Sequence, residues 1–259
     1  MEKQHLLVDV QDGVMKLTLN RPDSLNPLSN EMVAGICSAI HEASQQDDVR
    51  VVTIQGAGRA FCAGGDVKGM GENTPIQTHY FIEKLNEAIL AIRNLEKPVI
   101  AIVHGYAAGA GFSLALACDM IVASENSKFM MAFAQIGLIA DGGSNYFLPR
   151  LVGDKRAKEL LFSAEPIDAK QAESWGIVNH VYPVDEFEEK ANAFVQKFVN
   201  GPGKSYEMTK KLVNQSFVSD LDEMLSLEAL TQTLMEQTED FKEGIEAFKE
   251  KRKPHFKGK

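Results

Sequence analysis

The stretch His104–Asp119, which reads HGYAAGAGFSLALACD, decides how the chain around it is expected to fold. The apolar run Val99–Val103 comes directly before it and predicts a short buried strand. Gly105 then predicts a turn, and the small residues around Gly109 lead into a helix expected over Phe112–Ala117. A strand followed by a glycine-rich turn and a helix leaves backbone N–H groups exposed at the start of the helix.

Hydrophobic periodicity predicts the other elements. The expected strands are Leu6–Val10, Val14–Leu19, Val51–Ile54, Met120–Val122, Lys128–Met131 and Val178–Tyr182. The expected helices are one capped by Ser29 or Asn30 and those over Thr78–Leu95, Lys155–Ser163, Ala169–Trp175, Val184–Val199, Lys204–Gln215 and Leu221–Gln237. Strands alternate with helices in the first two thirds and nearly vanish afterwards, which predicts an α/β core followed by a helical C-terminal part.

Composition narrows the class of protein. A chain of 259 residues with 44% apolar residues can bury a sizeable core in one large domain. The formal net charge of -9 argues against nucleic acid or an anionic membrane as a partner, because either would require a basic face. Cys37, Cys62 and Cys118 form no CxxC pair, so we expect reduced thiols. With no apolar run of the roughly 20 residues needed for a membrane span, a soluble cytoplasmic protein is expected.

Several familiar motifs fail on their spacing. Gly56–Gly58 follows a predicted strand, but a dinucleotide fingerprint needs a third glycine where this chain has Phe61. Gly203–Ser205 resembles the end of a phosphate loop whose first glycine is replaced by Phe198. Ser113 lacks the glycine two residues later that a serine nucleophile elbow requires. The six histidines form no HxxxH or HxH pair, so no metal site is expected.

A carboxylate stands before another glycine pair in Gln135–Arg150, which reads QIGLIADGGSNYFLPR. Asp141 has two possible roles. It is a favoured residue type for capping the helix that follows, or it faces a ligand as an acid or base. The roles differ in pKa: a cap bonded to backbone amides has a lowered pKa, whereas an apolar pocket raises it.

Three glycine-rich turns are therefore candidates for a binding site, at Ala63–Gly65, Gly109–Gly111 and Asp141–Gly143. Backbone amides that converge from two such turns can bind a carbonyl oxygen as it gains negative charge. Loss of one donor of this kind typically costs about 2.7–4 kcal/mol of transition-state stabilisation. The alternative is that the glycines only permit tight turns.

Four segments, taken in order, resemble the crotonase superfamily, the enoyl-CoA hydratase/isomerase enzymes. They are NRPDSLNPLS at 20–29, RAFCAGGDVKGM at 59–70, HGYAAGAGFSLALACD at 104–119 and EGIEAFKEKRKPHF at 243–256. The resemblance implies an α/β fold with a crotonase-like spiral of ββα units, placed at residues 1–195, and a helical C-terminal trimerisation region, placed at 196–259. It also implies an acyl-CoA thioester substrate, with CoA as part of the substrate and no separate cofactor, and a homotrimer or homohexamer.

The resemblance also implies site residues. The backbone amides of Ala63 and Ala110 would form the oxyanion hole for the thioester. The residues that would contact the CoA substrate are Ser24, Leu25, Ala63, Gly65, Asp66, Val67 and Gly109.

Two departures from the family pattern concern the reaction. Hydratases of the family carry glutamates at two positions, where this chain has Ser113 and Phe133. Adding water to a double bond needs one group to deprotonate the water and one to deliver the other proton. This chain lacks glutamate at both positions, so hydration is not expected. Asp141 resembles the acidic residue that isomerase members place just before their glycine pair.

These departures predict an enoyl-CoA isomerase that shifts a 3,4 double bond to the 2,3 position, with Asp141 moving the proton. Three alternatives remain open at this stage. They are an isomerase of ring-opened or epoxidised aromatic acyl-CoA, an enoyl-CoA hydratase, and a non-catalytic acyl-CoA-binding protein.

Overall fold

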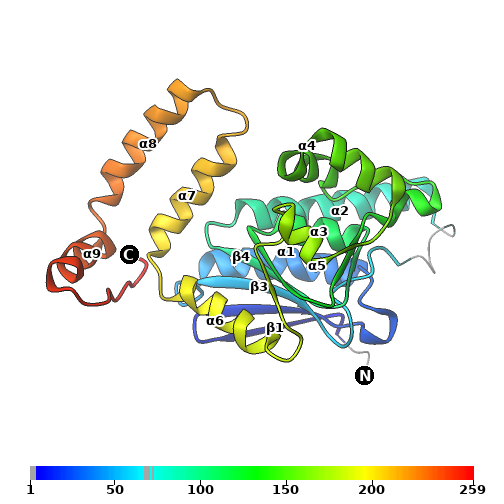
Figure 1. The fold of residues 1–259 in the computed structure, drawn as a ribbon, viewed down its shortest axis with the longest axis horizontal. Helices are drawn as coiled ribbons and strands as arrows, with labels where there is room; N and C mark the ends of the chain where they lie inside the picture. The colour runs from blue at the N-terminus through cyan, green and yellow to red at the C-terminus, as the bar shows by residue number, and fades with distance from the viewer. Residues whose placement is uncertain (1–3, 67–70, 72) are drawn as a thin grey trace.

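The computed structural model describes residues 4–66, 71 and 73–259. Within them, a six-stranded sheet forms the centre of the molecule (Figure 1). Its strands, in spatial order, are β1 (Leu6–Gln11), β2 (Val14–Leu19), β3 (Val51–Gly56), β4 (Val99–Val103), β6 (Met120–Ser124) and β9 (His180–Tyr182). The β1–β2 hairpin is antiparallel, and each later neighbour is parallel. The parallel strands therefore end at the same edge, where their loops meet.

A smaller second sheet lies beside this edge. It contains β5 (Tyr106–Ala108), β7 (Lys128–Met130) and β8 (Ile167–Asp168). Single bridges between Cys62 and Ala107 and between Leu28 and Gly65 extend the pairing beyond β5. Successive units such as β4–β5–α3 and β6–β7–α4 place one strand in each sheet and then add a helix. This confirms the predicted spiral of ββα units.

Helices cover both faces of the central sheet. Those of the core are α1 (Asn30–Gln45), α2 (Pro75–Asn94), α3 (Ala110–Ala117), α4 (Ser144–Ser163), α5 (Ala169–Ser174) and α6 (Phe187–Val199). Figure 1 shows α1, α2 and α3 together on one side of the sheet and α6 on the other. Short 3-10 turns at Pro22–Ser24 and Ala132–Ile136 lie in the loops.

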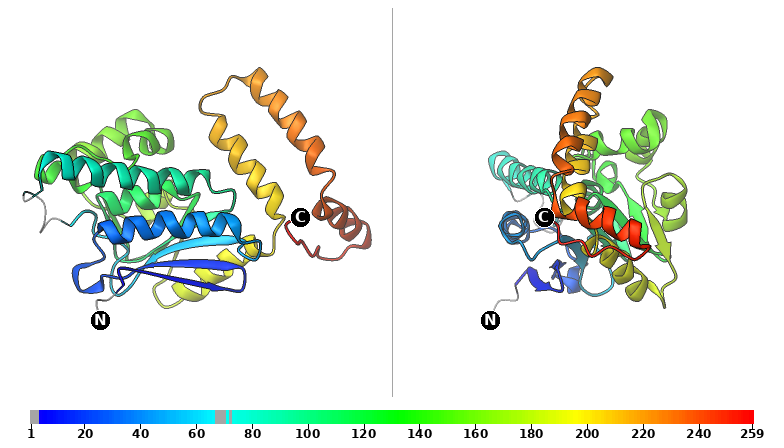
Figure 2. Two further views of the ribbon diagram at one scale, coloured as in Figure 1. Left: turned by 180° about the vertical axis from the view of Figure 1, so that it is seen from behind. Right: turned by 90° about the vertical axis from the view of Figure 1, so that its left-hand side faces the viewer.

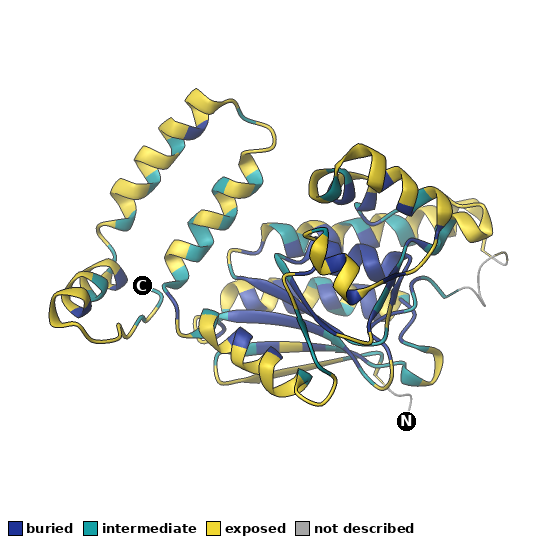
Figure 3. Cartoon of the chain, in the orientation of Figure 1, coloured by how far each residue is buried: buried dark blue, intermediate teal, exposed yellow. Residues whose placement is uncertain are grey.

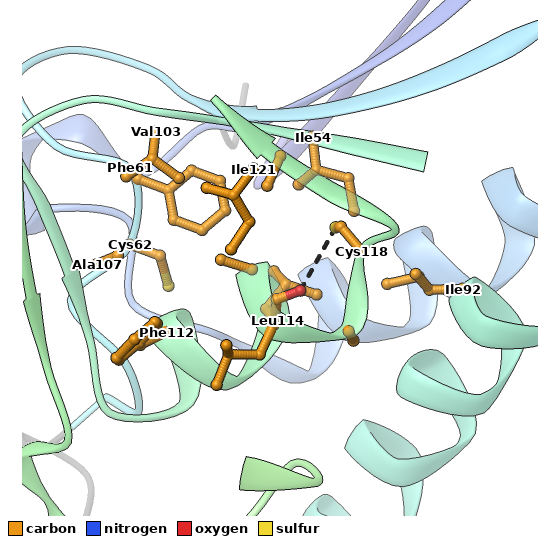
Figure 4. Packing of buried hydrophobic residues seen from close by; sticks show 14 of the residues in the cluster. Ile54, Phe61, Cys62, Ile92, Val103, Ala107, Phe112, Leu114, Cys118 and Ile121 are labelled. Atoms are coloured by element: carbon orange, nitrogen blue, oxygen red, sulfur yellow. Dashed lines mark hydrogen bonds between the residues drawn. The ribbon is translucent and has the colours of Figure 1, made fainter. Parts of the chain in front are cut away.

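Side-chain alternation along the strands separates two apolar clusters. Val52 and Ile54 belong to the larger cluster, which packs against α1, α2 and α3. Val51 and Ile100 point the other way and pack against α6. Figure 4 shows part of the larger cluster, with the buried Cys118 thiol donating to the Leu114 carbonyl at 3.5 Å.

The helices after α6 extend away from the core. They are α7 (Gly203–Gln215), α8 (Leu221–Met235) and α9 (Glu239–Glu250), and the left view of Figure 2 shows how they project. Their surfaces are mostly exposed or half-buried (Figure 3). The expected boundary at 195/196 falls inside α6, whose Phe198 and Val199 still pack against the core.

A buried ion pair fastens α7 to the core. The Lys210 ammonium lies 2.7 Å from the Asp119 carboxylate and also donates to the carbonyls of Ile92 and Lys97. Asp119 in turn accepts from the Val99 N–H at 2.8 Å, just where β4 begins. These contacts compensate part of the desolvation of the two charged groups.

Most predicted elements are present, and the differences have local causes. The helix predicted at Lys155–Ser163 is the second half of α4, because Gly153, with φ 76° and ψ 164°, interrupts a longer run. The strands β5 and β8 were not predicted, because three and two residues are too few for a periodic pattern. Helix α9 was not predicted either, because the sequence at 243–256 was used only for its resemblance to the superfamily.

Candidate active site

Asn26 anchors the loops that meet at the end of the parallel strands. Its side chain is fully buried, and its amide nitrogen donates to the carbonyls of Ala57 and Ala60, both at 2.8 Å. Its side-chain oxygen accepts from the Arg21 N–H at 2.8 Å. Asn26 itself has φ 57°, a region that asparagine tolerates better than most residues. One side chain thereby holds the loop after β2 against the loop after β3.

The three amides of the Ala63–Gly65 turn have different surroundings. The Ala63 N–H donates to the Leu25 carbonyl at 2.9 Å. The Gly64 backbone hydrogen-bonds to the Cys62 thiol. Among the described residues, the Gly65 N–H has no hydrogen-bond acceptor. The prediction that Ala63 supplies an oxyanion-hole donor is therefore wrong, because its N–H is already used; Gly65 carries the free amide of this turn.

A second free amide lies beside this turn, at the start of α3. Gly109 caps the helix with φ 51°, and its own N–H donates to the Met130 carbonyl at 2.8 Å. Ala110 is the first helical residue, so its N–H has no partner within the helix. A Cβ placed on Gly64 would lie 3.4 Å from the Ala110 nitrogen and 2.7 Å from the Ala108 carbonyl oxygen. Glycine at 64 therefore leaves the Ala110 amide uncovered.

Asp141 does not cap α4. The helix begins at Ser144, its N-cap is Gly143 with φ 84°, and no side chain bonds to its first amides. The Asp141 Oδ1 atom is buried and, within the described chain, has no hydrogen-bond partner. Desolvation by burial raises the pKa of the carboxyl from 3.8 to about 6, opposed only by a hydrogen bond from its own backbone N–H. Of the two roles open from the sequence, the structure thus excludes the cap.

The two positions of the missing glutamates have different surroundings. Ser113 is fully buried in α3, and its hydroxyl lies 2.6 Å from the Ser144 hydroxyl. Phe133 is half-buried, and its ring would lie 3.9 Å from a Cβ placed on Gly109. An apolar ring thus stands next to Gly109, the residue before Ala110. Neither position carries a group that can activate water.

The other residues expected to contact CoA are Ser24, Leu25, Asp66 and Val67. Ser24 is exposed, and Leu25 is half-buried with φ 66°. The Asp66 carboxylate accepts from the Arg21 guanidinium at 2.8 Å, so this side chain orders the loops. Val67 lies outside the described residues. Sequence reasoning did not identify Arg21 or Asn26, although both stand in the quoted NRPDSLNPLS segment.

Other possible features of the site were searched within the same residues. No group of three or more His, Cys, Asp and Glu side chains lies close enough to hold a metal ion in the part of the chain that the structure describes. None of the described helices is long and apolar enough to cross a membrane.

Comparison with known proteins agrees with this arrangement. The family profile described as Enoyl-CoA hydratase/isomerase matches residues 9–259. The chain is 35% identical to 1,2-epoxyphenylacetyl-CoA isomerase of Escherichia coli K12, and the match covers 99% of each chain. It is 34% identical to trans-2-decenoyl-[acyl-carrier-protein] isomerase of Streptococcus mutans, over 100% of each. The crystal structure of enoyl-CoA hydratase from Bacillus anthracis superposes with a TM-score of 0.94 at 32% identity, over 99% of this chain and 100% of that one.

The ββα spiral and these matches define the class: a crotonase-fold acyl-CoA enzyme. The chain belongs to the enoyl-CoA hydratase/isomerase family.

Proposed function

We propose that this enzyme shifts the double bond of an enoyl-CoA from the 3,4 to the 2,3 position, with Asp141 as the proton carrier. The observation that carries this proposal is the state of the Asp141 side chain. Its Oδ1 atom is buried without a hydrogen-bond partner in the described chain, and burial raises its pKa to about 6. A carboxylate with that pKa is mostly ionised at neutral pH and is a stronger base than an exposed one.

The reaction needs only proton transfer. The Asp141 carboxylate removes a proton from C2 of the 3-enoyl thioester, and the electron pair of the broken C–H bond delocalises onto the thioester oxygen as a dienolate. The same carboxyl group then returns the proton to C4, which leaves the double bond between C2 and C3. Atoms and charge balance without a co-reactant.

The backbone amides of Gly65 and Ala110 are the donors we assign to the dienolate oxygen. Both lack an acceptor among the described residues, and Gly64 keeps the two loops in contact. Preorganised donors of this kind typically contribute about 2.7–4 kcal/mol each.

Hydration is disfavoured by the surroundings of the site. The Ser113 hydroxyl is buried and already bonded, and Phe133 presents an apolar ring next to Gly109. A water molecule that attacks C3 would need a hydrogen-bonded base, and these two positions supply none.

One further activity has a specific observation in its favour. The chain is 35% identical along its whole length to an enzyme named 1,2-epoxyphenylacetyl-CoA isomerase. Isomerisation of an epoxidised aromatic acyl-CoA is therefore the second candidate.

The deciding experiment compares the wild type with Asp141→Asn on 3-enoyl-CoA, with Asp154→Asn as the matched control. Asp154 lies in α4 but is exposed, and its carboxylate pairs with Lys158. We expect Asp141→Asn to lose at least about 100-fold in kcat, at the lower end of general-base effects, and the control to keep its rate. Full activity of Asp141→Asn would refute the proposal.

Parallel assays separate the alternatives. Turnover of an epoxidised phenylacetyl-CoA in place of 3-enoyl-CoA would favour the second candidate. Hydration of crotonyl-CoA at about 10 per second or more would identify a hydratase. Binding of acyl-CoA with no exchange of C2 or C4 protons in deuterated water would identify a non-catalytic binder.

The same proposal includes a homotrimer or homohexamer, assembled through the projecting helices. Large apolar side chains on α8 and α9 are exposed, including Leu221 at 74% and Phe248 at 84%. Sedimentation of the full chain tests this; a monomer at micromolar concentration would contradict it.

Because Cys37, Cys62 and Cys118 are free thiols, we also place the enzyme in the cytoplasm, which cell fractionation tests.

A further inference from the structure

Two helices contribute to the site, and a pair of buried hydroxyl groups joins their first turns. Ser113 lies in α3 and Ser144 is the first residue of α4. Both side chains are fully buried, and their Oγ atoms are 2.6 Å apart. This is a short hydrogen bond even for two hydroxyl groups.

The bond continues on the α3 side to the oxyanion hole. The Ser113 hydroxyl donates to the Gly109 carbonyl at 3.2 Å, which leaves the Ser144 hydroxyl to donate to Ser113. Gly109 is the residue directly before Ala110, whose N–H we assign to the dienolate oxygen. The orientation of the Ala110 amide plane is thereby connected to the position of Ser113.

The α4 side leads to the proton carrier. The Ser144 N–H donates to the Asp141 carbonyl at 3.2 Å, so Asp141 and Ser144 close one turn. Gly142, between them, has φ 57°, and a Cβ placed on it would lie 2.8 Å from the Ser113 Cβ. The backbone next to Asp141 therefore rests directly on the Ser113 side chain.

Packing alone does not explain two hydroxyl groups at this place. Two alanines would fill almost the same volume, and replacing both partners of a buried hydrogen bond by apolar groups can be nearly neutral for stability. A hydrogen bond adds what an apolar contact lacks, namely a fixed distance and direction between the two helices.

We propose that Ser113 and Ser144 are positioning residues, whose hydroxyl–hydroxyl bond sets the distance between the Asp141 carboxylate and the Ala110 amide during proton transfer. This rests on the proposed isomerase function. Proton removal from C2 and return to C4 both require the carboxylate to stay within reach of the chain while the oxygen stays in its hole. A shift of about 1 Å in such a geometry can cost about 100-fold in rate.

The test uses the full-length chain and four variants: Ser113→Ala, Ser144→Ala, the double variant, and Ser127→Ala as the control. Ser127 is also fully buried and donates to a carbonyl, that of Val103, at 3.1 Å, but it lies outside α3 and α4. Each single site variant is expected to lose about 10- to 100-fold in kcat with KM within about twofold. The double variant should lose no more than either single one, because both remove the same bond.

The control separates positioning from stability. Ser127→Ala is expected to lower the melting temperature comparably while it keeps its kcat, so a loss of rate in Ser113→Ala is not a general effect of a weaker fold. Wild-type kcat in Ser113→Ala and Ser144→Ala, with Asp141→Asn inactive, would overturn this inference alone. An inactive wild type, or an active Asp141→Asn, would overturn the proposed function and the inference together.

Discussion

The desolvated carboxylate of Asp141 destabilises the folded protein at neutral pH, so Asp141→Asn is expected to stabilise it. A carboxyl group whose pKa is higher in the folded state binds its proton more tightly there than in the unfolded chain. The folded protein is thus favoured when the group is protonated. Stability falls as the pH rises from about 4 to about 6, and this loss is complete above the folded pKa of about 6.

The magnitude follows from the two pKa values. A rise from 3.8 to about 6 corresponds to about 3 kcal/mol, at about 1.36 kcal/mol for each tenfold change in proton affinity. The side chain is only half-buried, so solvent screens part of this energy. We expect Asp141→Asn to raise the free energy of unfolding at pH 7.5 by about 1–2 kcal/mol, or the Tm by about 2–6 °C.

The assay is urea unfolding of the wild type, Asp141→Asn and Asp154→Asn at pH 4.5 and 7.5, at one protein concentration so that assembly contributes equally. The difference between Asp141→Asn and wild type should be clear at pH 7.5 and small at pH 4.5. The Asp154→Asn control should differ little from wild type at either pH. An Asp141→Asn protein that is equally or less stable than wild type at pH 7.5 would refute the desolvation on which the proposed base depends.

Further expectations concern the pH profile and two structural contacts. Because the base must be ionised, kcat/KM should fall about tenfold per pH unit below about 6, whereas an ordinary Asp141 carboxyl would hold the rate to near pH 4. Asn26→Ala leaves the buried Ala60 carbonyl and the partly buried Ala57 carbonyl without this donor, so urea unfolding should show a loss of about 2–3 kcal/mol and the KM for acyl-CoA should rise. Lys210→Ala leaves the Asp119 carboxylate unpaired at the base of α7, at a cost of about 3–5 kcal/mol, whereas replacing both residues by apolar ones should recover most of it.

Local sequence patterns predicted most of the fold. The alternation in Val14–Leu19 and the apolar runs of β3 and β4 identified the central strands, because side-chain period depends only on neighbouring residues. The quoted segments identified the superfamily, and with it the spiral. Short strands such as β5 were not predicted, because their pairing is decided by residues distant in the chain.

The sequence predicted which segments form the candidate site, but not the contacts between them. The sequence correctly drew attention to the glycine turn at Ala63–Gly65, but it selected the wrong amide. Which N–H of that turn stays free depends on the Leu25 carbonyl and the Cys62 thiol, and neither contact has a local signal. The sequence showed Ser113 only as a failed nucleophile and as the site of a missing glutamate, because its partner Ser144 is 31 residues away in the chain.

By itself, the sequence determined the order of the longer strands and of most helices, the glycine turns, and the presence of a carboxylate before the third of them, because these are properties of residue type and short spacing. Only the tertiary structure decided that Asp141 is no helix cap. Its α4 begins at Ser144 behind a left-handed Gly143, and the core packed around the carboxylate removes water from it. Desolvation and free hydrogen-bond donors are properties of what surrounds a group, and long-range packing sets them.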